Sequence, residues 1–223
     1  MSWPALTPAR TPERRWPMAV AVLAAILFQV ITPHSGGLVF WWVFPVLETI
    51  ALVVMIIRDL GRIDRRTRAA RRATIVLIVL LTIGTVAGLV VLTLDIVDTD
   101  YAPTVGATAL LGRGAALWVT NVVVFSLWFW ELDRGGAAER AAASPIPPSF
   151  GFPEDAMPEL AADGWIRRYP DYLYLSFTNA TAFSPTDTLP VRTWAKMTMM
   201  VEAVISLTTA ILVIARAVNV LPG

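Results

Sequence analysis

The stretch ATIVLIVLLTIGTVAGLVVLTL, residues Ala73–Leu94, contains no charged side chain and is long enough to cross a bilayer as a helix. Four other long apolar runs lie at about 17–33, 38–57, 109–130 and 195–215. Backbone groups in lipid must be hydrogen-bonded within their own segment, so each run is expected to be helical. The sequence therefore predicts an all-α, polytopic membrane helix bundle with about five transmembrane helices.

The composition agrees with a membrane protein and excludes several kinds of site. The 223 residues are 56% hydrophobic and 16% charged, whereas soluble domains carry about 25% charged residues. The net charge of +1 offers no electrostatic reason to bind nucleic acid. Cysteine is absent and His34 is the sole histidine, so thiolate and multi-histidine metal sites are excluded. We expect no metal and no cofactor.

The link between the second and third apolar runs is the most basic part of the chain. Its seven arginines are Arg58, Arg62, Arg65, Arg66, Arg68, Arg71 and Arg72. Short loops rich in arginine stay in the cytoplasm, and the N-terminal tail also carries arginines. We therefore expect a multi-pass protein of the plasma membrane with a cytoplasmic N-terminus. The lipid bilayer is its expected partner, and Arg58–Arg72 are expected to contact anionic lipid headgroups.

Four regions follow from this pattern. They are a cytoplasmic tail at 1–16, a four-helix region at 17–131 with the basic loop 58–72, a proline-rich linker at 132–170 and a last module at 171–223. Gly135 and Gly136 are expected to end the fourth helix. The linker is too short for a soluble catalytic domain, so we do not expect an enzyme.

The polar and aromatic stretch YLYLSFTNATAFSPTDTLP, residues 172–190, precedes the last apolar run. Asp171 can cap a short helix, and Pro185 must end it. A short helix, an extended polar segment and a spanning helix follow one another in a re-entrant pore loop. The candidate pore-lining residues are Thr178, Asn179, Thr181, Ser184, Thr186 and Asp187.

The residues from Tyr172 to Leu221 resemble the C-terminal parts of two families. The run Y-L-S-F-T followed by a final helix ending I-A-R-A-V resembles the pore module of two-helix potassium channels. The stretch also resembles a bacterial integral membrane family of unknown function, which has a similar aromatic segment before its last helix. No glycine lies between Asp171 and Arg192, so the glycine-containing potassium filter that the first resemblance implies is missing.

Two carboxylates lie inside apolar runs, Glu48 in the second and Glu202 in the last. A charge at membrane depth is costly, so each is expected to face a polar partner or water. The pair can form part of a proton or cation path, or can make interhelical hydrogen bonds. Asn121 and Gln29 are interpreted as interhelical contacts. Gly84 and Gly88 form a G-x-x-x-G pattern that favours close helix packing.

Three functions remain open. The first is a channel-like protein for ions or small solutes, and it is expected to be a homo-oligomer because one helix hairpin cannot surround a pathway. The second is a non-conducting membrane scaffold or accessory subunit with a degenerate pore-like hairpin. The third is a membrane enzyme, which needs a clustered nucleophile or metal site that the scattered carboxylates do not indicate. The order of elements around Pro185 favours the channel-like protein.

Overall fold

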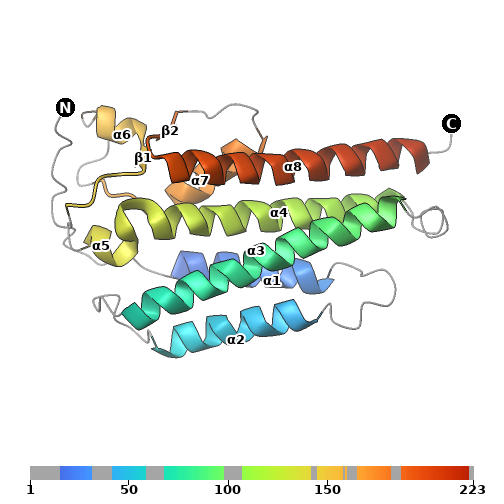
Figure 1. Ribbon diagram of the computed structural model, residues 1–223, viewed down its shortest axis with the longest axis horizontal. Coiled ribbons are helices and arrows are strands. Elements are labelled where there is room, and N and C mark those ends of the chain that lie inside the picture. The colour runs from blue at the N-terminus through green and yellow to red at the C-terminus, as the bar shows by residue number, and fades with distance from the viewer. Residues whose placement is uncertain are drawn as a thin grey trace.

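The computed structural model describes residues 16–31, 42–58, 68–97, 107–141, 145–157, 159, 165–181 and 187–220. In these residues the chain is almost wholly helical, and the longer helices lie side by side in an elongated bundle (Figure 1). They are α1 (Trp16–Ile31), α2 (Val43–Arg58), α3 (Arg68–Val97), α4 (Ala107–Leu132), α7 (Tyr169–Thr181) and α8 (Thr193–Val220). The expected all-α helix bundle is therefore confirmed.

Three helices are long and apolar enough to cross a membrane. They comprise Arg71–Val97, Leu111–Gly135 and Thr193–Arg216. The apolar parts of α1 and α2, Trp16–Val30 and Val43–Val54, are shorter. The structure thus provides three of the five expected candidate spans at full length, and the total of five stays a prediction.

The distribution of polar and apolar side chains is the reverse of that in a soluble protein. On α8, Val204, Ile214 and Val218 are each more than 60% exposed, whereas Glu202 of the same helix and Asn121 of α4 are completely buried. Large apolar side chains are also exposed along α1, α2 and α3. Exposed apolar faces of this extent suit lipid better than water.

Helix α4 lies at the centre of the bundle. It packs against α1, α3, α7 and α8, and all its residues from Thr120 to Leu127 are buried. A helix that is apolar on every side is typical of such a position. Its buried Phe125, Phe129 and Trp130 belong to the main hydrophobic core. The sequence of α4 therefore provides packing surfaces for four neighbours at once.

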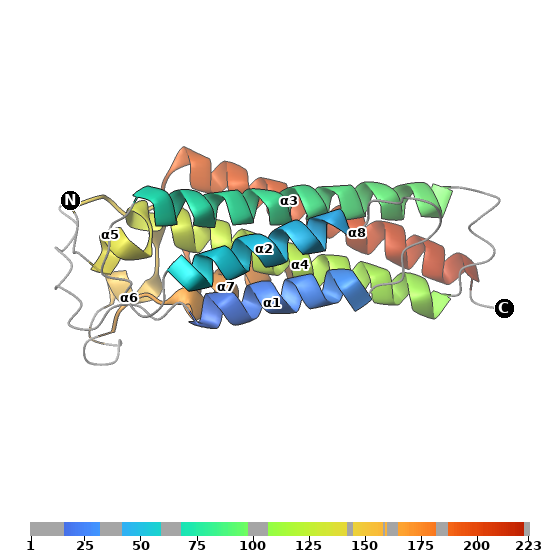
Figure 2. The same cartoon turned by 90° about the horizontal axis from the view of Figure 1, so that it is seen from below.

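Helices α1 to α4 alternate in direction along the bundle, whereas α7 and α8 run in the same direction (Figures 1 and 2). Helix α2 ends at Arg58 and α3 begins at Arg68 at the same end, which we call the basic end. Helices α1, α7 and α8 begin at this end and α4 finishes there, as both views show. Helices α1 and α2 are therefore antiparallel neighbours in the bundle.

Helix α7 runs antiparallel to α4 and ends part of the way along it. Tyr169 at its start bonds to Ser126, whereas the ring of Phe177 near its end packs edge-on against Trp118 at 5.7 Å. Its 13 residues cover about 20 Å, less than the hydrocarbon thickness of a bilayer. The chain is back at the basic end before α8 begins there.

The proline-rich segment folds against the basic end. It contains η2 (Asp133–Gly135), α5 (Ala137–Ala141), β1 (Phe150–Gly151) and α6 (Pro153–Ala156). Strand β1 pairs antiparallel with β2 (Leu189–Pro190), which leads into α8. Gly135 and Gly136 have φ values of 80° and 97°, a conformation that glycine adopts without strain. The prediction that these glycines end the fourth helix is therefore confirmed.

Candidate functional site

The strongest polar cluster inside the bundle surrounds Glu202, at the meeting of α4, α7 and α8. The Asn179 Nδ2 atom donates to Oε2 of Glu202 at 2.7 Å and to the Met199 carbonyl at 3.0 Å. The Ser176 hydroxyl bonds to Oε1 of Glu202. Glu202 and Ser176 are both completely buried. The cluster therefore joins α7 to α8 through a carboxyl group that is fully buried.

The hydrogens of this cluster can be counted. The Ser176 Oγ atom contacts Oε1 of Glu202 and also lies 2.7 Å from the Val122 carbonyl of α4. A serine hydroxyl has a single hydrogen, whereas a carboxylate and a carbonyl can only accept. A neutral Glu202 that donates to Ser176, which in turn donates to Val122, satisfies all three groups. This arrangement leaves no uncompensated charge in the centre of the bundle.

Asn121 of α4 extends the cluster toward the middle of α8. Its Nδ2 atom donates to Ser206 Oγ at 2.9 Å and to the Glu202 carbonyl at 3.2 Å. The interpretation of Asn121 as an interhelical contact is confirmed. Each of the helices α4, α7 and α8 thus contributes a polar side chain, and each bond crosses a helix interface.

The candidate pore-lining residues do not share one surface. Thr178 and Thr181 bond to carbonyls of their own helix, such as Thr178 to Tyr174 and Thr181 to Phe177. Thr178 is buried, whereas Thr181 and Asp187 are exposed. Asn179 lies in the Glu202 cluster. Ser184 and Thr186 lie outside the described residues.

Glu48, the other predicted carboxylate, lies in a separate cluster between α1, α2 and α3. Gln29 Nε2 donates to its Oε2 at 3.0 Å, which confirms Gln29 as an interhelical contact. The other oxygen, Oε1, has no hydrogen-bond partner among the described residues. A Cβ at Gly84 would lie 3.0 Å from this oxygen, and one at Gly88 would lie 3.2 Å from Leu117 of α4. The predicted G-x-x-x-G pattern thus marks close approaches to two helices. In the described part of the chain, no hydrogen bond joins Glu48 to Glu202.

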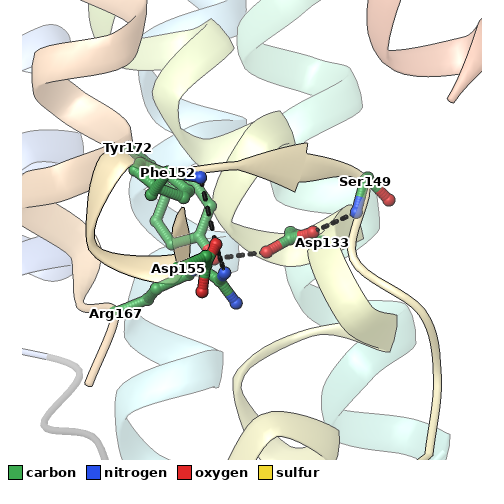
Figure 3. A network of polar contacts seen from close by, with 6 residues as sticks. All are labelled: Asp133, Ser149, Phe152, Asp155, Arg167 and Tyr172. Carbon is green, nitrogen blue, oxygen red and sulfur yellow. Dashed lines mark hydrogen bonds and ion pairs between the residues drawn. The ribbon is translucent and has the colours of Figure 1, made fainter. Parts of the chain in front are cut away.

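A third polar cluster closes the basic end (Figure 3). Asp133 accepts from the Ser149 backbone N–H and from the Tyr172 hydroxyl, both at 2.7 Å. Burial raises the pKa of the Tyr172 phenol well above its ordinary value, so this hydroxyl stays a donor into the alkaline range. Asp155 accepts from the Phe152 backbone N–H at 3.0 Å and pairs with Arg167. These bonds hold the proline-rich segment against the start of α7.

Arg140 locks the same cluster from the side of α5. Its Nη1 atom donates to the carbonyls of Trp130 and Asp133 at 2.6 and 2.9 Å. Its guanidinium lies 5.1 Å from the centre of the Tyr172 ring, within the range of a cation–π contact. Arg140 can stay charged while buried, because the two carbonyls and the Tyr172 ring stabilise its guanidinium in place of water.

Sequence reasoning missed two kinds of residue. Ser176 was not singled out, although it lies three residues before Asn179 and therefore on the same helix face. The buried residues of 132–170 were missed because their prolines indicate a linker. Their partners, such as Asp133 with Tyr172, are 39 residues apart in the sequence. No periodicity connects residues that far apart.

Among the described residues, no group of three or more histidine, cysteine or acidic side chains is arranged to hold a metal ion. No family model, no curated protein and no solved structure matches the chain. The resemblance of the last module to potassium-channel pores and to the bacterial membrane family therefore stays a prediction.

Proposed function

We propose that the protein is a multi-pass membrane scaffold or accessory subunit in which α7 and the segment before α8 form a degenerate pore-like hairpin that does not conduct. The observation that carries this proposal is the internal bonding of Ser176 and Asn179 to Glu202. Polar groups that already bond to one another within the protomer are not free to replace the hydration shell of an ion. The missing filter glycines support the same conclusion.

The threonines of α7 support the proposal further. The hydroxyl groups of Thr178 and Thr181 donate hydrogen bonds to backbone carbonyls one turn earlier in the same helix. The remaining exposed face of α7 is largely aromatic, with Tyr174 and Phe177 about half exposed. Aromatic faces of this kind suit packing against lipid or another protein more than they suit a polar passage.

A channel-like protein is the second candidate, and one observation favours it. Helix α7 enters at the basic end and is too short to cross the bilayer, and the chain is back at that end where α8 begins. This is the topology of a re-entrant hairpin. Conduction would then take place between protomers of a homo-oligomer, with Asp187 near the entrance.

Flux measurements on purified protein in liposomes distinguish the two candidates. We expect wild-type protein to release potassium, sodium, chloride and protons no faster than empty liposomes, while a sharp thermal transition shows that it is folded. Gramicidin in parallel liposomes is the positive control for cation and proton flux. Flux that is present in the wild type and altered in Asp187→Asn would reject the scaffold and establish the channel.

A scaffold must also have a partner. We expect extraction of the native membrane into lipid nanodiscs to recover the protein in a complex of defined size with another membrane protein. Glu202→Ala, which removes the link between α7 and α8, is expected to weaken this complex. Recovery of a monomer alone, together with absent flux, would contradict both candidates.

A further inference from the structure

Arg134 is held in a conformation and an environment that are both unfavourable for arginine. Its φ and ψ are 49° and 29°. These values lie in the left-handed region, which residues other than glycine, asparagine and aspartate rarely occupy. The residue is only 6% exposed. Among the described residues, its Nε has no hydrogen-bond partner, and we find no hydrogen bond from its side chain.

The neighbouring charges do not compensate Arg134. The charged groups that act on it are Arg167, which repels it, and Asp133 and Asp155, which attract it. Asp133 already accepts from Ser149 and Tyr172, and Asp155 pairs with Arg167. Both carboxylates are thus engaged by other donors, and among the described residues neither is hydrogen-bonded to Arg134.

We propose that Arg134, with Arg167 beside it, binds a phosphate-type oxyanion at the basic end of the bundle. A guanidinium offers a planar fork of donors that matches two phosphate oxygens, and a bound anion would supply Arg134 with the acceptors and the negative charge that Asp133 and Asp155 give to other groups. The anion is either the phosphate of an anionic lipid headgroup or a soluble phosphate. The site is separate from the Glu202 cluster, so it does not depend on the proposed function.

Thermal unfolding of the full-length protein tests this site. Tryptophan fluorescence follows unfolding in a zwitterionic detergent while inorganic phosphate is added, with chloride at matched ionic strength as reference. A second titration uses dioctanoyl phosphatidylglycerol, with dioctanoyl phosphatidylcholine as reference. A ligand that binds the folded state raises the Tm in a saturable way. Saturation by inorganic phosphate identifies a soluble anion, and saturation by the glycerol lipid alone identifies a headgroup.

Variants show whether the response belongs to Arg134. Arg134→Gln is expected to weaken the apparent affinity by about tenfold or more. Arg168→Gln is the matched control, because Arg168 lies one residue from Arg167, is exposed and carries the same charge. It is expected to respond as the wild type does. Arg134→Lys, which keeps the charge without the fork, is expected to give an intermediate affinity.

Two results would overturn the proposal. One is a wild-type Tm that neither phosphate nor phosphatidylglycerol raises beyond its reference. The other is a saturable rise that Arg134→Gln leaves unchanged. Should Arg134→Gln not fold, Arg134→Lys decides in its place, since an affinity equal to that of the wild type would exclude recognition by the guanidinium fork.

Discussion

The amide of Asn179 on α7 donates a 2.7 Å hydrogen bond to the carboxyl group of Glu202 on α8, 23 residues further along the chain. The same carboxyl group bonds to Ser176 one turn earlier on α7. Helices α7 and α8 are thus joined through one buried side chain. Removing these hydrogen bonds should weaken the packing of α7 against the bundle, whereas α8 should keep its position.

Asn179→Ala should destabilise the protein by about 1–3 kcal/mol, because it leaves one buried oxygen of Glu202 without a donor. Chemical unfolding in a mixed micelle measures this change. Thr181→Ala is the control on the same helix, since Thr181 is exposed and bonds to its own helix. The control should change stability by no more than about 0.5 kcal/mol. Equal effects of the two substitutions would mean that the Asn179–Glu202 hydrogen bond does not stabilise the packing of α7 against α8.

Two neighbouring glycines of α4 should respond in opposite ways to alanine. A Cβ at Gly114 would press against three atoms of Val213 on α8, whereas a Cβ at Gly112 would meet nothing within 4 Å. Gly114→Ala should therefore destabilise by about 1–3 kcal/mol through overpacking. Gly112→Ala should stabilise by up to about 1 kcal/mol, since alanine favours helix. Thermal unfolding of both variants checks the α4–α8 contact, and destabilisation by both would contradict it.

The Tyr172 phenol should make stability depend on pH in the alkaline range. Burial raises its folded-state pKa well above the ordinary value of about 10. Its contribution is complete below that value and decreases as the pH rises above it, because the unfolded state releases the proton more readily. Unfolding free energies measured from pH 8 to about 11.5 should therefore fall more steeply for the wild type than for Tyr172→Phe. Parallel curves would show that the phenol is not buried in this way.

Arg134→Asn should stabilise the protein in the absence of phosphate, by about 1 kcal/mol from backbone strain alone. Asparagine tolerates the left-handed conformation, and the substitution also removes a buried guanidinium whose Nε has no hydrogen-bond partner among the described residues. Thermal unfolding in chloride buffer with zwitterionic detergent measures this effect. A lower Tm of the variant would show that the Arg134 side chain itself stabilises the fold. The strained backbone of this residue would then be explained without a bound anion.

The helices themselves are evident in the sequence. Apolar runs such as Ala73–Leu94 must be helical in lipid, and Gly135 and Gly136 end α4 where the sequence predicts. Glu48 and Glu202 also stand out, because a carboxyl group within an apolar run needs a partner wherever the run packs. These features depend only on residues that are close together in the sequence, so they can be predicted from one segment at a time.

The partners of those residues are decided only by the tertiary structure. Asn179 is predicted as a pore-lining residue, yet it faces α8 because α7 packs antiparallel to α4 with Ser176 against Val122. The basic end is a further example, since Asp133 and Tyr172 belong to separate segments. Composition determines that helices form and that their apolar faces suit lipid. Which buried polar groups satisfy one another depends on how the helices are rotated and how deeply each is inserted, and those are properties of the packed bundle.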